Sequence, residues 1–175
     1  MITSPRSRLV LAGLSACGLA ALAWAAFVQP LPRLVYNPSD SIPVGWYRIG
    51  PADALRVGAI VLTTLPPDAA ALAAQRHYLP ARVPLLKRVG AVAPQHVCVF
   101  DALVWIDGVP VAAVLPADRL GRLLPSWPQC RRLEAGELFL LSVTNPASFD
   151  SRYFGPVSAA AVIGVAQPVW LEKRP

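Results

Sequence analysis

Acidic residues are missing from the first 39 positions of this chain, and charge is sparse in the rest. Only 15% of the 175 residues are charged, whereas 55% are hydrophobic, and the mean hydropathy is +0.48. These values exclude an intrinsically disordered chain. The formal charge of +6 comes from scattered basic residues, with no cluster of Lys and Arg among aromatic residues, so nucleic acid is not indicated as a partner.

Histidine and cysteine are also scarce, with two and three residues. Neither His77 nor His96 lies near a plausible Ser and Asp partner, so a Ser-His-Asp triad fits poorly. No pair of ligands completes a metal tetrad with His96 and Cys98, and no metal or organic cofactor is implied. In an oxidising compartment Cys98 and Cys130 either form a disulfide or stay as two free buried thiols.

One long apolar run dominates the N-terminus. Leu9–Val28 contains twenty residues without a charge, enough to cross a bilayer of roughly 30 Å as a helix. Arg6 and Arg8 precede it, so we expect residues 1–8 in the cytoplasm and residues 29–175 as one domain on the periplasmic side of a bacterial inner membrane. The residues after the span include 14 basic and 10 acidic ones, and this positive excess suits a surface near anionic inner-membrane lipid.

Two other interpretations of the run are weaker. A cleaved secretory signal has a hydrophobic core of about 7–15 residues, which is shorter than this one. Leu14–Cys17 resembles a lipobox, in which Cys17 would be acylated, but the chain stays apolar for eleven further residues. A transmembrane anchor over residues 9–28 is therefore favoured, with Cys17 as a small residue that faces lipid.

The rest of the chain has the pattern of many short strands. Runs rich in β-branched and aromatic residues alternate with turn signals such as Asp107-Gly108, and most of the 19 prolines lie between the runs. Pro67–Tyr78 has high helix propensity. The sequence predicts a mainly β protein, with a single N-terminal transmembrane helix and then a compact β domain with one or two short helices. The expected strands are 46–49, 57–62, 85–92, 97–100, 104–106, 109–114, 138–143 and 162–171.

The stretch Asn37–Tyr47 presents two hydroxyls between stiff flanks. Pro38 and Pro43 each restrict the residue before them to extended conformations. That suits a serine hydroxyl held at a fixed angle, here Ser39 or Ser41. Taken alone, the stretch is more often a structural turn.

Lys87 follows an apolar pair on a predicted strand. On a buried face its charged form is disfavoured and its pKa falls, so that the neutral amine can take a proton from a serine. An exposed strand lysine is the commoner case for a single Lys.

The stretch Ser148–Val157 packs hydroxyl, ionic and aromatic groups into one short segment that ends in Gly-Pro. Asp150 and Arg152 can form a charge-assisted pair there. Ordinary surface turns seldom carry this density of functional groups.

In this order behind an apolar N-terminal run, the three stretches resemble the type I signal peptidase family. That family's serine motif, Ser-x-Ser-Met-x-Pro, is similar to Ser39–Ile42, although Pro43 follows directly here. Its lysine motif, Lys-Arg-(Val/Ile)-x-Gly, is similar to Lys87–Gly90 with one residue fewer. Its last motif, Asn-Ser-x-Asp-Ser-Arg-Tyr-(Trp/Phe)-Gly, matches Ser148–Gly155 almost throughout.

The resemblance implies a signal-peptidase-like β domain and a serine endopeptidase with a Ser–Lys dyad, in which Ser41 is the nucleophile and Lys87 the general base. Its implied supporting residues are Ser39 as oxyanion donor with the Ser41 N–H, Ser148 as the partner that orients the lysine amine, and Asp150 and Arg152 as the pair that holds the last motif. An oxyanion donor is worth about two to three orders of magnitude in rate, which is the loss expected for Ser39→Ala. The substrate is expected to bind as an added strand, with small, Ala-like residues before the cut.

Departures from the family pattern indicate a branch. Ser41–Tyr47, the stretch Gly121–Trp127 and the compact length look like the TraF-type proteases of conjugative transfer. That branch implies a pilin precursor as substrate, which in some systems is closed into a ring, here through the acyl-enzyme. General cleavage of secreted preproteins stays open as an alternative.

Two further alternatives are weaker. A non-catalytic, membrane-tethered assembly subunit of a secretion or conjugation channel would make all three motifs coincidental. A self-cleaving repressor-type Ser–Lys protease would be soluble and would carry a DNA-binding domain, which the sequence does not contain.

Overall fold

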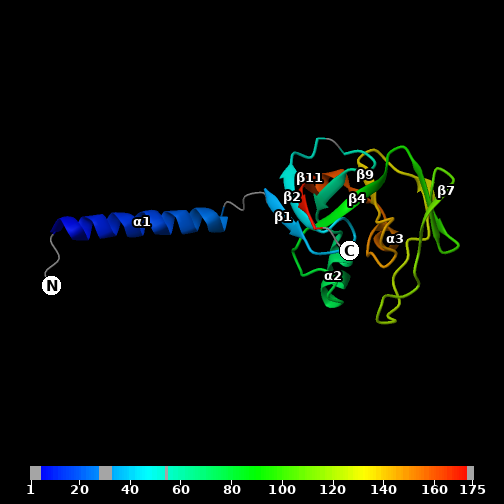
Figure 1. The fold of residues 1–175 in the computed structure, drawn as a ribbon, viewed down its shortest axis with the longest axis horizontal. Helices are drawn as coiled ribbons and strands as arrows, with labels where there is room; N and C mark the ends of the chain where they lie inside the picture. The colour runs from blue at the N-terminus through cyan, green and yellow to red at the C-terminus, as the bar shows by residue number, and fades with distance from the viewer. Residues whose placement is uncertain (1–4, 28–32, 54, 173–175) are drawn as a thin grey trace. The chain divides into compact units, whose positions relative to one another are not determined.

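The chain divides into two units, residues 1–32 and 33–175. The computed structural model describes residues 5–27, 33–53 and 55–172 (Figure 1). The predicted segments 1–8, 9–28 and 29–175 therefore lie partly outside the described residues.

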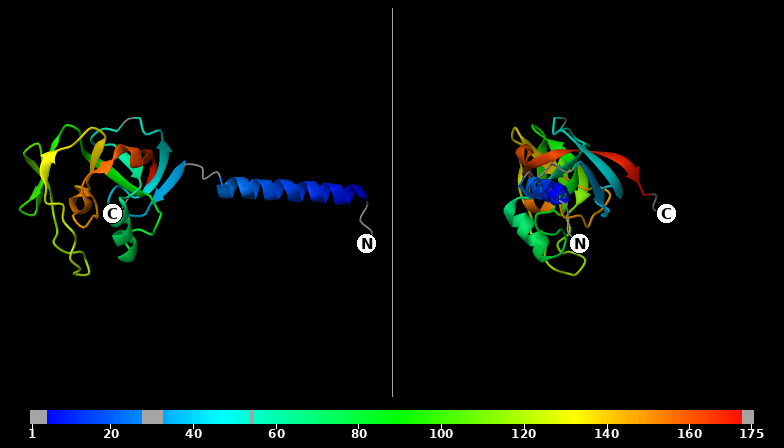
Figure 2. Two further views of the ribbon diagram at one scale, coloured as in Figure 1. Left: turned by 180° about the vertical axis from the view of Figure 1, so that it is seen from behind. Right: turned by 90° about the vertical axis from the view of Figure 1, so that its left-hand side faces the viewer.

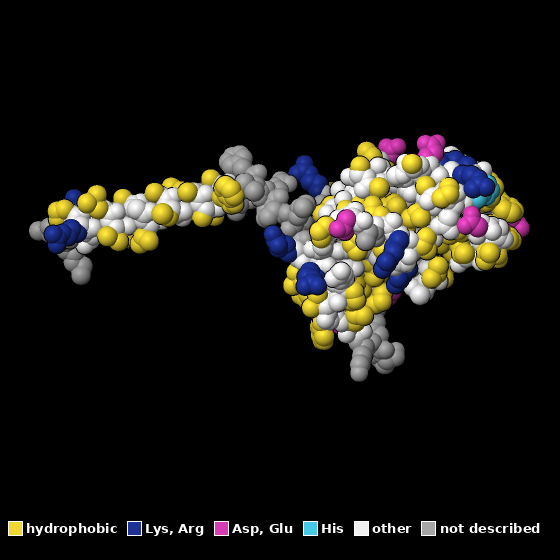
Figure 3. All heavy atoms as spheres, turned by 90° about the horizontal axis from the view of Figure 1, so that it is seen from above, with side chains coloured by type: hydrophobic (Ala, Val, Ile, Leu, Met, Phe, Trp, Pro, Cys, Tyr) yellow, Lys and Arg dark blue, Asp and Glu magenta, His cyan; other side chains and the backbone are white. Residues whose placement is uncertain are grey.

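The first unit is a single helix, α1 (Pro5–Phe27). Its Ala- and Leu-rich sequence has high helix propensity, and its one proline stands at the first position, where no backbone bond is lost. Apolar side chains cover the face seen in Figure 3, with basic residues at the N-terminal end. Within it, Pro5–Trp24 is long and apolar enough to cross a membrane. This helix is consistent with a membrane anchor.

The described residues of the second unit form two antiparallel sheets (Figures 1 and 2). The seven-stranded sheet has the order β1-β2-β11-β3-β4-β9-β10 and the four-stranded sheet the order β7-β6-β5-β8. The strands are β1 (Leu34–Asn37), β2 (Gly45–Gly50), β3 (Ile60–Thr63), β4 (Leu85–Val92), β5 (His96–Phe100), β6 (Leu103–Ile106), β7 (Val109–Ala113), β8 (Cys130–Arg132), β9 (Glu137–Leu140), β10 (Val157–Ser158) and β11 (Val162–Leu171). The helices are α2 (Pro67–Gln75), α3 (Ser151–Phe154) and the 3₁₀ helix η1 (Ala159–Ala161).

The mainly β architecture with short helices confirms the predicted fold class, and several boundaries differ. The predicted strand 57–62 is observed as β3, which begins at Ile60, because Gly58 has a φ of +88° and turns the chain before it. The predicted helix 67–78 stops at Gln75, since His77 adopts a left-handed φ of +60°. The short strands β1, β8 and β10 and the helix α3 were not predicted.

The larger sheet brings the three motif stretches together. Its core is a buried cluster that includes Val61, Val89 and Leu140, packed where β3, β4 and β9 lie side by side. Lys87 lies on β4, an inner strand of this sheet, opposite Val61 of β3. Ser41 lies on the loop between β1 and β2, and the last motif ends in α3.

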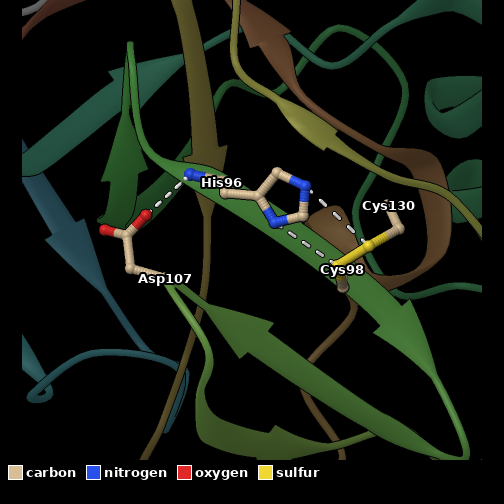
Figure 4. The surroundings of a disulfide bond; sticks show 4 residues. All are labelled: His96, Cys98, Asp107 and Cys130. Atoms are coloured by element: carbon tan, nitrogen blue, oxygen red, sulfur yellow. Dashed lines mark hydrogen bonds between the residues drawn. A yellow bond between two sulfur atoms is a disulfide. The ribbon is translucent and has the colours of Figure 1, made fainter.

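A disulfide joins two neighbouring strands of the smaller sheet. Cys98 of β5 lies opposite Cys130 of β8, and their sulfur atoms are bonded (Figure 4). The His96 ring lies beside the bond, with Nδ1 3.5 Å from the Cys98 sulfur and Nε2 3.9 Å from the Cys130 sulfur. Ligand atoms of these three residues lie within 4.8 Å of one another. Because both sulfurs are used in the disulfide, they offer no thiolate to a metal in this state.

Candidate active site

Asn37 organises the loop that carries Ser41. This buried amide donates from Nδ2 to the carbonyl oxygens of Ser39 (2.8 Å), Ile42 (3.1 Å) and Pro43 (3.1 Å). Its Oδ1 accepts from the Ser39 hydroxyl at 2.9 Å. The loop is therefore fixed by side-chain bonds in addition to the stiffening prolines. In this arrangement the Ser39 hydroxyl is engaged by Asn37.

Lys87 is almost completely buried, with 2% of its surface exposed. Burial lowers the pKa of its amine to about 8, and the nearby Asp150 carboxylate opposes that shift by favouring the charged form. The nearby Arg152 charge lowers the pKa further. A lysine in this state holds a substantial neutral fraction near pH 8, which a free lysine does not.

Ser148 connects the lysine to the serine. The Lys87 amine donates a hydrogen bond to the Ser148 hydroxyl oxygen, and that oxygen lies 3.2 Å from the Ser41 hydroxyl oxygen. Among the described residues, Ser41 and Lys87 share no direct hydrogen bond. The three side chains come from β4 and from two loops far apart in sequence.

A buried ion pair supports this group. Asp150 and Arg152 are both fully buried and paired, with Nε 2.7 Å from Oδ1 and Nη2 2.8 Å from Oδ2. The Arg152 guanidinium also donates to the carbonyl oxygens of Ala113 (2.8 Å) and Ser148 (3.2 Å). Such a bidentate pair fixes the last motif, so it sets the position of Ser148.

The short helix α3 is fixed at both of its ends. Asp150 caps α3 by accepting from the Arg152 backbone N–H. Gly155 follows with a φ of +78°, and a Cβ there would lie 2.6 Å from the Trp127 indole nitrogen. The glycine is therefore required by both backbone conformation and packing.

A groove of about 940 Å³ opens over the serine and the lysine. Its walls come from β1, the end of α2, the segments 79–87 and 115–124, and the last motif. Asp118 links the segment 115–124 to the residues that follow α2, because its carboxylate accepts a hydrogen bond from the Tyr78 hydroxyl. The same carboxylate accepts from Arg122 Nε of its own segment at 2.7 Å. The many apolar side chains in this lining suit a groove that binds a largely apolar ligand.

Sequence reasoning missed two polar residues at the site. The sequence motif that contains Asn37 assigns no role to this residue. Ser142 was not singled out, although its hydroxyl donates to the Ser41 carbonyl oxygen at 2.8 Å and its backbone N–H donates to Asp150 Oδ2 at 3.0 Å. A local signal existed for Asn37, because Asn before a turn often bonds to the backbone that follows. None existed for Ser142, which acts across 101 residues of sequence.

Family comparison defines the class of protein. The model of the family described as signal peptidase, peptidase S26, matches residues 6–171. The chain belongs to this family, and its class is that of the serine peptidases.

Proteins of plasmid transfer are among its relatives. The chain is 34% identical over 171 residues to the plasmid transfer protein TraF of Escherichia coli, with 91% of this chain and 92% of that protein covered. It is 35% identical over 145 residues to a probable conjugal transfer protein TraF of Sinorhizobium fredii, with 78% and 76% covered. Among solved structures, a signal peptidase I of Enterococcus faecalis is 19% identical, with 65% of this chain and 97% of that chain covered and a TM-score of 0.39.

Proposed function

We propose that this protein is a membrane-anchored Ser–Lys endopeptidase that removes a leader or terminal segment from a translocated precursor, the conjugative pilin above all. The observation that carries the proposal is the buried Lys87 amine, bonded to Ser148, which lies next to the Ser41 hydroxyl. Similarity to TraF proteins supports a role in conjugation. The helix α1 supplies the anchor.

The chemistry follows from these contacts. Neutral Lys87 takes the proton of the Ser41 hydroxyl, and the serine oxygen attacks the scissile carbonyl to give a tetrahedral intermediate. The protonated Lys87 amine then gives this proton to the leaving amine as the C–N bond breaks, and the acyl group stays on Ser41. Ser148 holds the amine in position. The Ser39 hydroxyl and the Ser41 backbone N–H together stabilise the oxyanion. To donate to the oxyanion, the Ser39 hydroxyl hydrogen has to turn away from Asn37 Oδ1. Asp150 and Arg152 keep Ser148 in place.

Release of the acyl-enzyme determines the product. Attack by water gives a shortened linear chain, whereas attack by an amine of the substrate gives a new peptide bond and a ring. The balance depends on exclusion of water and placement of the amine.

The test is the intact mass of a candidate pilin precursor co-expressed with the wild-type protein or with Ser41→Ala. A loss of mass that corresponds to the removed segment, and that requires Ser41, supports the proposal. A further deficit of one water indicates ring closure. An uncut precursor in both samples, repeated with a generic secreted preprotein, would favour the non-catalytic assembly role.

A further inference from the structure

Two cysteines and a histidine lie together on one face of the smaller sheet (Figure 4). His96 and Cys98 are two positions apart on β5, so their side chains point to the same face. Val97, between them, belongs to the buried core cluster, so this face is the one that points away from the core. β8 pairs with β5 and places Cys130 opposite Cys98. The fold therefore adds a third metal-binding side chain to the two that are neighbours in the sequence.

The His96 ring lies close to both sulfur atoms. A nitrogen and a sulfur bound to one tetrahedral zinc ion lie about 3.6 Å apart, given bond lengths of about 2.0–2.1 Å and 2.3 Å. In the structure Nδ1 is 3.5 Å from the Cys98 sulfur, and Nε2 is 3.9 Å from the Cys130 sulfur. Asp107 fixes the histidine backbone, because its carboxylate accepts from the His96 N–H at 2.8 Å. Breaking the sulfur–sulfur bond therefore leaves three metal-binding side chains around one point.

Reduction of the disulfide supplies the thiol groups. Cys130 is exposed, whereas only 7% of Cys98 is, so a dithiol reductant attacks the Cys130 sulfur. The sulfur–sulfur bond breaks, Cys98 leaves as a thiolate, and the second thiol of the reductant releases Cys130 from the mixed disulfide. The protein gains two electrons and two protons, and the reductant becomes a disulfide. Both cysteine thiols lose their protons when a metal ion binds them.

We propose that the reduced pair, Cys98 and Cys130, binds one zinc ion together with His96. Thiolate and imidazole are preferred ligands of zinc, and two thiolates neutralise its charge. The neighbouring cation, Arg132 opposite His96, donates to the Pro94 carbonyl oxygen at 3.3 Å and faces a centre with no net charge. The described residues add no fourth side chain to the group, so water completes the tetrahedron. The ion then links β5 to β8 in place of the disulfide.

The experiment uses the full-length chain in detergent, without a histidine tag and with Cys17→Ala, which removes the remaining cysteine. One sample is reduced with a phosphine and desalted without oxygen, and the other stays oxidised. Titration of zinc against a coloured chelator should give one bound ion per reduced chain and none per oxidised chain. Cobalt(II) in place of zinc should give a thiolate-to-metal charge-transfer band in the reduced sample alone. Zinc should also raise the melting temperature of the reduced chain, because a ligand of the folded state stabilises it.

Variants separate the proposed ligands from adventitious binding. His96→Gln should weaken zinc binding by at least about tenfold, since the loss of even an outer partner of a metal site costs that much. His77→Gln is the matched control, because His77 is exposed and lies outside the group, and it should bind zinc as the parent chain does. Cys98→Ala/Cys130→Ala should bind none. If that double variant does not fold, the oxidised chain, which has no free thiol at the site, decides.

Two results overturn the inference. One is equal zinc binding by the reduced and the oxidised chain, and the other is equal binding by His96→Gln and its parent. Neither result bears on the proposed function, because none of the three residues lines the groove at Ser41.

Discussion

Lys87 shows how one buried residue links stability to chemistry. Burial lowers its pKa from 10.5 to about 8, so at neutral pH the protein holds a charge where water cannot reach it. Burial of the charged amine lowers the free energy of unfolding. Because burial disfavours the charged form, it also increases the fraction of neutral amine that can act as a base. We therefore expect the site to reduce stability in exchange for reactivity.

The pH dependence of cleavage tests this point. Because only the neutral amine can accept a proton, kcat/KM should rise about tenfold per pH unit below pH 8 and level off above it. Lys87→Met should abolish cleavage while raising the free energy of unfolding at pH 7 by up to about 3 kcal/mol. The folded-state pKa lies below the unfolded one, so the cost is full below pH 8 and is relieved as the pH rises towards 10.5. The gain in stability should shrink accordingly at pH 10.

Ser41→Ala is the control for this comparison. It also removes activity but leaves the buried amine in place, so its stability should follow the wild type across the same pH range. A plateau of kcat/KM that begins at pH 6, or residual turnover in Lys87→Met, would contradict the assignment of Lys87 as base. Urea denaturation at both pH values supplies the free energies.

At the scale of the elements, local sequence predicted those that carry their own pattern. β4 and β11 were placed with the observed bounds, because their apolar runs are long and bounded by turn signals. β1, β8 and β10 have two to four residues each, which is too short for a pattern of their own. β8 in addition depends on pairing with β5, and the paired residues Cys98 and Cys130 are 32 positions apart. In the candidate site, too, some contacts can be predicted from local sequence and others cannot. The ionic pair of the last motif was predictable within three residues, whereas the contact of Ser142 with Ser41 depends on the fold.

The smaller sheet depends on a covalent link between its strands. Cys98 and Cys130 are 32 positions apart, and closing a loop of this length stabilises a fold by about 2–4 kcal/mol. Cys98→Ala/Cys130→Ala should lower the melting temperature by the amount that corresponds to this loss of free energy. Cleavage should persist at temperatures where the variant stays folded, since neither cysteine lines the groove at Ser41 and Lys87.

Cys17→Ala provides the matched control for the disulfide. It removes the remaining, exposed cysteine and should leave the melting temperature unchanged. A reductant should reproduce the double variant in the wild type and have no effect on the double variant itself. Equal melting temperatures in all samples would show that the link adds nothing to stability.

At the scale of the whole molecule, the distribution of charge predicts a topology. Both basic residues of the first unit precede its long apolar run, Leu9–Val28, and every acidic residue lies in the second unit. A short basic flank tends to stay in the cytoplasm, so the β domain should lie on the outer side of the inner membrane. Protease added to spheroplasts should digest the β domain and spare an N-terminal tag.

Reversing the charge of the N-terminal flank should change the orientation of the protein in the membrane. Arg6→Glu/Arg8→Glu removes the positive bias, so a substantial share of the β domain should become protected from external protease. Arg33→Glu/Arg48→Glu changes the same number of charges beyond the helix and should keep the domain exposed. Protection of the wild-type domain would place the Ser41 hydroxyl on the cytoplasmic side, where it would meet a precursor before translocation. The leader-removal reaction would then have to precede export, and a peptidase acting on translocated chains would be the wrong description.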